Sequence, residues 1–311
     1  MIGKAKNLIE PKVSIVFLNW NGKKDTIGLV ESLKKMSYKN YHTIVVDNGS
    51  TDGIEKGFNK KYRNIATLIR NDRNWGEAEG KNIGIREALR RGSDYVLVMD
   101  NDMYVDKNFL GPLVDKMEKH PEVAVAGSKI YYADPKNVIW SAGCDYHFKG
   151  FTSRNQNEID VGQTDKTRYV DAVDCVFFMR ASVLREIGIL RGKYFTMYDL
   201  TGWCLRASKK GYKSLYVPKS KVWHKVSATY NRNAKKKGMT LYYEIRNWLL
   251  CNRESESTFY FLWILFLQSL VFFLPRSALY IKNGQPGLIK VYIEAILDAL
   301  RNKTSFEIYK P

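Results

Sequence analysis

The feature that most constrains the fold is a series of short apolar runs, each followed directly by an amide or carboxylate side chain. The runs and the residues after them are Val13–Leu18 with Asn19, Thr43–Val46 with Asp47, and Tyr95–Met99 with Asp100. Apolar, β-branched runs of this length indicate buried strands. Because ligands of open α/β sheets bind at the carboxyl ends of the strands, we expect these polar side chains to meet at one edge.

The segments between the runs indicate helices. Asp25–Met36 carries apolar residues at helical spacing, Ala78–Arg91 is a second helical segment that ends before Gly92, and Ile65–Ile69 is a further candidate strand. Strands that alternate with helical segments predict an α/β fold around a mostly parallel sheet. The second half is less regular: we expect a polar loop over Tyr146–Lys166, a strand over Val170–Arg180 and a short helix over Ser182–Ile187.

Charge and cysteine content narrow the class of protein. The 311 residues carry a formal net charge of +18, which favours acidic partners such as nucleotide phosphates, anionic lipid or nucleic acid. The four dispersed cysteines argue against a zinc site or a disulfide framework and fit a reducing cytoplasm. We expect no nucleic-acid partner, since the chain lacks a helix-turn-helix, zinc-finger or RNA-binding signature.

Two acidic residues one position apart, Asp100 and Asp102, follow the third run. Such a pair can cap a turn, lie in solvent, or hold a divalent cation, because Mg²⁺ and Mn²⁺ take oxygen ligands and bridge to substrate phosphates. Taken alone, the pair does not decide among these readings. Its neighbours in the sequence do.

Four motifs in order carry a family resemblance: LNWNGKKD, VVDNGSTDG, RNDRNWGEAEGKNIGIREA and VMDNDMYVD. In this order and spacing they resemble the family-2 glycosyltransferases, inverting enzymes of the GT-A fold that use nucleotide-sugar donors. The resemblance extends from about Val13 to His224. It is strongest to the rhamnosyltransferase-like members, which extend lipid-linked glycans or polysaccharides.

The resemblance implies roles for individual residues. The residues implied to bind the donor, a UDP-, GDP- or dTDP-sugar, are Asn19, Asp47, Asn48, Asn74, Gly76, Lys81, Asn82 and Asp100. Lys81, near a helix start, would face the diphosphate. Asp100, Asp102 and His224 would hold Mg²⁺ or Mn²⁺. Taken one at a time, DNGSTDG can be only a turn, Lys81 an exposed cation and His224 a structural histidine.

The catalytic base is the point at which the chain departs from the family pattern. Family members carry a Glu-Asp pair before a helix that ends in C-x-R, and here the stretch is YFTMYDLTGWCLRASKKGY. Asp199 falls at the Glu position, Leu200 replaces the usual base Asp, and Arg191 stands where an acid is common. Asp199 is the candidate base, and a helix-capping Asp is the alternative.

The C-terminal part predicts membrane association. Leu205–Arg253 contains thirteen Lys or Arg residues and one acid, Glu244. The uncharged run Ser257–Leu274 follows, long enough to reach roughly 27 Å as a helix. Gly287–Leu300 has an amphipathic pattern. A span, a re-entrant or surface helix, and an oligomer interface all remain open for the apolar run.

These observations predict a membrane-associated, metal-dependent inverting glycosyltransferase with a lipid-linked glycan or polysaccharide acceptor. The alternatives are a polyprenyl- or dolichyl-phosphate sugar synthase, or a catalytically impaired family member. We expect a transferase domain over 1–225, a basic mobile segment over 226–254 and a membrane-associating region over 255–311. In the mobile segment, YNRNAKKKGM and YYEIRNW resemble family motifs, which implies that Arg246 and Lys235–Lys237 close over diphosphate or contact a phosphorylated acceptor. The N-terminal residues lack the apolar core of a signal peptide, so we expect the catalytic domain on the cytoplasmic side of the cell membrane.

Overall fold

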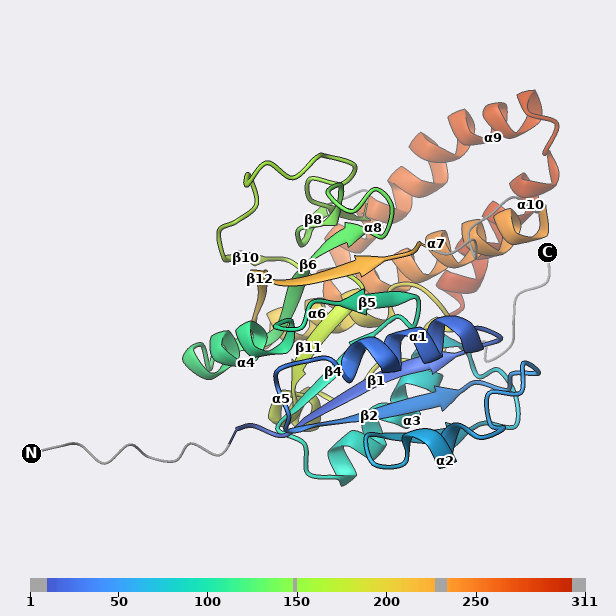
Figure 1. Ribbon diagram of the computed structural model, residues 1–311. Coiled ribbons are helices and arrows are strands. Elements are labelled where there is room, and N and C mark those ends of the chain that lie inside the picture. Colours follow the sequence, from blue (N-terminus) through green and yellow to red (C-terminus); the bar gives the residue numbers. More distant parts are fainter. Residues whose placement is uncertain (1–9, 148–149, 227–233, 304–311) are drawn as a thin grey trace, which may run out of the picture.

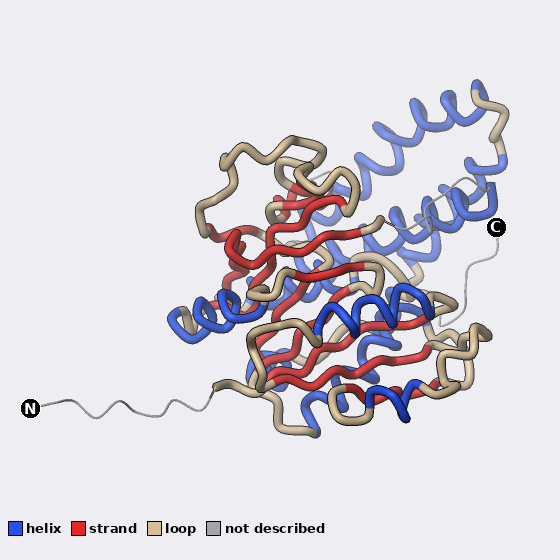
Figure 2. The backbone as a smooth tube through the Cα atoms, in the orientation of Figure 1, coloured by secondary structure: helices blue, strands red, loops and turns tan. Residues whose placement is uncertain are grey.

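A mixed β-sheet forms the centre of the molecule. The computed structural model describes residues 10–147, 150–226 and 234–303. Along the sheet the strands run β10-β12-β6-β11-β4-β1-β2-β3, with β5 beside β12, β7 beside β6 and a separate β8–β9 hairpin (Figures 1 and 2). The strands are β1 Val13–Asn19, β2 Tyr41–Asp47, β3 Ala66–Arg70, β4 Tyr95–Met99, β5 Met103–Val105, β6 Val123–Tyr132, β7 Ile139–Ser141, β8 Cys144–His147, β9 Gly150–Ser153, β10 Arg168–Val170, β11 Val176–Arg180 and β12 Lys213–His224.

Helices cover both faces of this sheet. One face packs against α1, α2 and α4, and the other against α3, α5 and α6. The helical elements are α1 Lys23–Leu33, α2 Phe58–Tyr62, α3 Gly76–Arg90, α4 Leu110–Lys119, α5 Ala181–Ile187, the 3₁₀ turn Gly192–Tyr194, α6 Asp199–Lys209, α7 Ala234–Ser255, α8 Thr258–Phe266, the π-helical turn Leu267–Phe272, α9 Phe273–Lys282 and α10 Gly287–Leu300. The α/β fold predicted from the alternating runs is therefore confirmed.

Strands β1, β2, β3 and β4 form the parallel part of the sheet. β1 pairs in parallel with β2 and β4, and β2 with β3, so the residues after these strands share one edge. Helix α3 lies close against β1 because Gly84 faces Val16, where a Cβ would overlap the valine side chain. This close approach brings the N-terminus of α3 to the edge at which the strands end.

Two predictions for the second half need correction. The single strand expected over Val170–Arg180 is wrong, because β10 ends at Val170 and β11 begins only at Val176. Between them Cys175 has a φ of 45°, a left-handed conformation that breaks an extended path. The loop expected over Tyr146–Lys166 contains most of the β8–β9 hairpin.

The C-terminal helices form a third group, which packs around α7. Tyr242, Leu249 and Tyr292 belong to its buried cluster. This cluster also includes Tyr194, from the 3₁₀ turn that precedes α6 in the α/β part of the chain. The continuous helix Thr258–Lys282 is, by length and composition, able to cross a membrane, and only 11% of its most apolar stretch is buried. Figure 1 shows this helix projecting from the body while α10 lies beside α7.

Candidate active site

Asn19 and Asp47 lie side by side at the ends of β1 and β2, as the sequence predicted. Asn19 Nδ2 donates to Ser50 Oγ (2.9 Å) and to Asp52 Oδ2 (3.1 Å), so it ties β1 to the turn after β2. Asn19 and Asp47 are both fully buried. Asp47 Oδ2 accepts no hydrogen bond within the described residues, although Arg70 Nη1 lies 3.6 Å away. One buried carboxylate oxygen is therefore left to accept a hydrogen bond.

Asn48 connects this turn to the start of α3. Its Nδ2 donates to Asn74 Oδ1 (2.8 Å) and to the Gly76 carbonyl (3.0 Å), and Asn74 Oδ1 also accepts from the Gly76 amide (2.8 Å). The first turn of a helix leaves amide groups without intrahelical partners, which suits it to anions. The three residues thus fix where the positive end of α3 lies.

Gly76 is required by both its backbone angle and its surroundings. Its φ is +83°, and a Cβ there would lie 2.6 Å from the Phe195 carbonyl oxygen. We expect Gly76→Ala to lower the free energy of unfolding by about 1–3 kcal/mol, because an L side chain is strained at this φ and also clashes. Chemical denaturation measures the loss. Gly57→Ala is the control, since Gly57 has a φ of +82° but open space around it. Equal losses in the two variants would contradict the role of the Phe195 contact.

Lys81 forms a buried ion pair with Asp199. Lys81 Nζ lies 3.0 Å from Asp199 Oδ2 and 3.2 Å from Glu77 Oε2, and the side chains of Lys81 and Asp199 are each 6% exposed. Burial alone would lower the pKa of Lys81, but the charges of Asp199, Glu77 and Asp100 raise it overall. The ammonium therefore stays charged beside the candidate base, within the electrostatic influence of Asp100.

Asn82 has a structural role in this arrangement. Its side chain exchanges two hydrogen bonds with the backbone of Leu190, one with the carbonyl and one with the amide, each 3.0 Å long. The side chain thereby holds the segment that leads to Asp199 against α3. Asn82 is 2% exposed, about as buried as Asp47 and Asn48 at the same edge, and its role in donor binding stays a prediction.

Asp199 is the first residue of α6, and the helix shows no side-chain capping hydrogen bond. The N-cap is Tyr198, and Asp199 is an acid in the first turn, where it suits the positive end of the helix, so the capping alternative stays open. Leu200, at the position where the family usually carries its base, is buried in the core between α6 and the sheet. Of these two residues, only Asp199 offers a carboxylate beside Lys81.

The acidic pair after β4 meets the end of β12. His224 Nε2 lies 3.0 Å from Asp102 Oδ1. Burial lowers the pKa of His224, but the hydrogen bond to Asp102 and the charges of Asp100 and Asp102 raise it overall. Burial and the nearby Asp102 charge raise the pKa of Asp100 to about 6, against the lowering effect of Lys81 and His224. The structure thus brings together the three residues expected to hold a metal.

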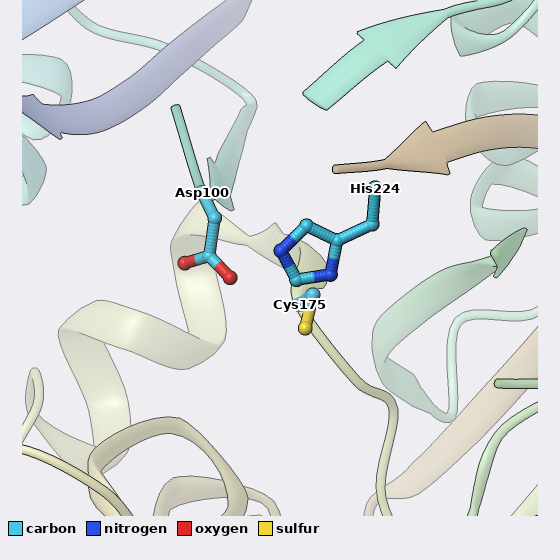
Figure 3. Close-up of side chains that lie close together, drawn as sticks. All are labelled: Asp100, Cys175 and His224. Carbon is cyan, nitrogen blue, oxygen red and sulfur yellow. The ribbon is translucent and has the colours of Figure 1, made fainter. Parts of the chain in front are cut away.

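Cys175 also belongs to this cluster, and sequence reasoning did not find it. Ligand atoms of Asp100, Cys175 and His224 all lie within 4.8 Å of one another, and Figure 3 shows the carboxylate and the thiol each close to the imidazole. Burial and the charge of Asp174 hold the pKa of the thiol well above its usual value. β11 pairs antiparallel with β4, and this pairing, which no local pattern signals, places Cys175 opposite Asp100.

The residues fit a divalent cation. The cluster offers two carboxylates and an imidazole, a donor set that Mg²⁺ or Mn²⁺ accepts. His224 Nδ1 is buried and has no hydrogen-bond partner within the described residues, so one ring nitrogen is left for a ligand. Trp140 packs edge-on against the imidazole at 5.5 Å between ring centroids and helps to fix its plane.

Arg246 does not lie where the sequence suggested. Its side chain is fully buried in the C-terminal helices, where it donates to the carbonyls of Lys193 and Lys303. It is therefore not available to close over a diphosphate. Residues 227–233 and the side chains of Lys235 and Lys236 lie outside the described part of the chain, so the prediction for that segment stays a prediction.

The chain is similar in sequence to known glycosyltransferases. The family model described as Glycosyl transferase family 2 matches residues 14–188. A dTDP-rhamnosyl transferase, RfbF of Shigella flexneri, is 25% identical over 293 residues, covering 90% of this chain and 92% of that protein. Glycosyltransferase GlyG of Streptococcus pneumoniae is 28% identical over 139 residues, 43% of this chain and 45% of that protein.

Solved structures share the fold at low sequence identity. A mannosyltransferase, PcManGT of Pyrobaculum calidifontis in complex with GDP-Man and Mn²⁺, has a TM-score of 0.56 at 14% identity, covering 95% of this chain and 89% of that chain. GalNAc-T7 with UDP, GalNAc and Mn²⁺ has a TM-score of 0.60 at 14% identity; the match covers 87% of this chain but only 58% of that one.

Proposed function

The chain belongs to glycosyltransferase family 2 and has the GT-A fold, and we propose that it is a membrane-associated, metal-dependent inverting enzyme. It is a glycosyltransferase with a nucleotide-sugar donor. The acceptor we propose is a lipid-linked glycan or a polysaccharide. The observation that carries the proposal is the ion pair of Asp199 with Lys81, next to the acidic pair at the edge where the parallel strands end.

The donor would bind along the edge formed by β1, β2 and α3. The free oxygen of Asp47 suits a base N–H or a ribose hydroxyl, because a carboxylate accepts such hydrogen bonds. The amides at the start of α3 suit the diphosphate. We propose a dTDP-sugar first, on the basis of the similarity to RfbF over most of both chains, with UDP- and GDP-sugars as the other candidates.

Asp100, Asp102 and His224 would hold the cation, Mg²⁺ or Mn²⁺. When bound, a divalent ion supplies positive charge that stabilises the leaving diphosphate. The raised pKa of Asp100 supports the assignment, since it marks a buried carboxylate that the surrounding protein charges do not fully neutralise.

Asp199 would act as the base. In an inverting transfer the acceptor oxygen attacks the anomeric carbon, the bond from that carbon to the nucleotide diphosphate breaks, and the hydroxyl proton passes to the Asp199 carboxylate. Lys81 keeps this carboxylate at the site by a 3.0 Å ion pair. The charge of Asp100 also raises the pKa of Lys81. This supports a position of the Lys81 ammonium between the base and the diphosphate.

A panel of nucleotide sugars tests the proposal. The purified protein is incubated with dTDP-, UDP- and GDP-sugars and a bacterial lipid extract, with Mn²⁺, with Mg²⁺ and with chelator. We expect nucleotide release that needs one donor, the extract and the cation. Release that chelator leaves unchanged would contradict the metal site, and release without any extract would contradict the lipid-linked acceptor.

The exposed apolar face of α8 and α9 supports membrane attachment. Large apolar side chains face solvent there at Phe259, Leu262, Trp263, Phe266, Leu270, Val271, Leu274, Leu279 and Ile281. Contiguous exposed apolar surface of this kind marks an interaction site. The net charge of +18 favours an anionic lipid surface over a neutral one.

The path of α10 favours insertion from one side over a complete span. Tyr242 donates to Asp298 (2.7 Å), Arg253 to the Leu300 carbonyl (3.1 Å) and Lys193 to Asn302 (2.9 Å), so the end of α10 is tied to the catalytic body. The 14 residues of α10 extend only about 21 Å, less than the ~30 Å of the hydrocarbon core. We therefore propose that α8 and α9 enter one leaflet and that the chain leaves on the same side.

Replacing three exposed aromatic residues should release the protein from lipid. We expect the triple variant Phe259→Ser, Trp263→Ser, Phe266→Ser to lose co-sedimentation with vesicles that contain anionic phosphatidylglycerol, because most of the inserted apolar area is gone. Donor-dependent nucleotide release should persist, since these side chains lie outside the site. Val161→Ser, which alters a side chain exposed as fully as Phe259, is the matched control. Full sedimentation of the triple variant would contradict the membrane assignment.

One alternative is favoured by a specific observation. Leu200 replaces the usual base and is buried. A polyprenyl-phosphate sugar synthase has an acceptor phosphate that is already ionised, so it needs no base and tolerates this leucine. Polyprenyl phosphate offered as the acceptor in the donor panel separates this alternative from transfer to a hydroxyl.

A further inference from the structure

The segment that leads into Asp199 has an unusual backbone. Met197 and Tyr198 have φ values of 62° and 61°, and neither is a glycine. The left-handed conformation is unfavourable for residues with side chains, so neighbouring groups must hold the two in place. Asp199 follows directly, and its position depends on this turn.

Asn247 of α7 contacts the backbone of this segment at three points. Its Nδ2 lies within hydrogen-bond distance of the carbonyls of Tyr194 (3.3 Å), Thr196 (2.6 Å) and Met197 (3.2 Å). The side chain is fully buried.

Arg246 orients that amide. Its Nη1 donates to Asn247 Oδ1 (2.7 Å) and to the Lys193 carbonyl (3.1 Å). With its oxygen held by the guanidinium, Asn247 can only present its NH₂ group to the segment. Arg246 and Asn247 thus hold the backbone from Lys193 to Met197 in place through hydrogen bonds to its carbonyls.

We propose that Asn247 is a positioning residue for the transfer reaction: it fixes the left-handed turn and thereby holds the Asp199 carboxylate beside Lys81. The inference rests on the proposed function, since it takes Asp199 as the base. Asn247 itself acts through the turn and touches no substrate. Through Asn247, helix α7 then helps to position the base in addition to supporting the membrane-facing helices.

A double-mutant cycle between Asn247 and Asp199 tests the proposal. We expect Asn247→Ala to lower kcat by roughly 10- to 100-fold with little change in the KM for the donor, because a small displacement of a catalytic group has an effect of this size. In the Asp199→Asn background the same substitution should cause no further loss, since the group that it positions is already gone. A merely structural role would lower activity in both backgrounds.

Two further variants keep the result interpretable. Asn252→Ala is the matched control, because Asn252 is also buried on α7 but contacts Trp248 and Tyr146 instead of the turn. Its kcat should stay near that of the wild type. Asn247→Ser keeps one hydroxyl donor and should recover part of the kcat that alanine loses, which remains measurable if the alanine variant folds poorly.

The outcomes separate the inference from its premise. Near-normal transfer by Asp199→Asn would refute the base assignment and the inference together. An impaired Asp199→Asn enzyme beside a normal Asn247→Ala enzyme would refute the positioning role alone. Losses that multiply in the double variant would also refute it.

Discussion

Asp102→Ala should abolish sugar transfer while leaving the fold intact. The carboxylate lies beside Asp100 and His224, and its charge would be needed to hold the cation that stabilises the departing diphosphate. We expect transfer to fall by roughly 100-fold or more, the size of effect seen when a charge-stabilising group is removed from an active site. Nucleotide release with Mn²⁺ or Mg²⁺ measures this loss, and thermal unfolding checks the fold.

A second substitution separates the charge of Asp102 from its hydrogen bond. Asp102→Asn can still accept from His224 Nε2 but carries no negative charge, so it should be nearly as impaired as the alanine variant. Titration of Mn²⁺ into each variant gives a readout that does not depend on turnover. Asp106→Asn is the control, because Asp106 lies at the end of β5 and caps only the turn at Asn108. Near-normal turnover by Asp102→Ala would contradict the metal assignment.

The half of the fold that contains β1, β2, β3 and β4 was predictable because its sequence signals are local. Each short apolar run became a strand, and β4 matches the predicted range of Tyr95–Met99. The parallel pairing then places Asn19, Asp47 and Asp100 at one edge by geometry alone. For the amphipathic tail, α10 has the predicted bounds of Gly287–Leu300, since the apolar period of a helix is also a local signal.

The parts of the site that depend on distant pairing were not predictable. Cys175 reaches Asp100 only because β11 is inserted antiparallel beside β4. Lys81 and Asp199 are 118 positions apart, and the sequence predicts a diphosphate contact for one and a base or cap for the other, but not their ion pair. The resemblance of YYEIRNW to a family motif predicts Arg246 over the diphosphate or at a phosphorylated acceptor. The burial of Arg246 follows from the packing of α7 and α10, which a local pattern does not contain.

Asp199→Asn should lower transfer to a hydroxyl acceptor by at least ~100-fold. A hydroxyl is a poor nucleophile until a base takes its proton, an effect that typically contributes ~10²–10⁴-fold. Asparagine keeps the size of the side chain and a hydrogen-bond acceptor for Lys81, but it cannot take up that proton. Donor affinity should change little, since the loss concerns a group that acts only in the transition state. Transfer kinetics and nucleotide binding, measured separately, test both parts.

The ion pair with Lys81 complicates this experiment, because removing one charge of a buried pair leaves the other uncompensated. A loss of stability is therefore expected alongside the loss of transfer, and the double variant Lys81→Met, Asp199→Asn, which removes both charges, should regain stability without regaining transfer. If Asp199→Asn transfers the sugar at close to the wild-type rate, the carboxylate is not the base. The acceptor is then one that needs no deprotonation, and the buried leucine at position 200 ceases to be an anomaly because a phosphate acceptor is already ionised.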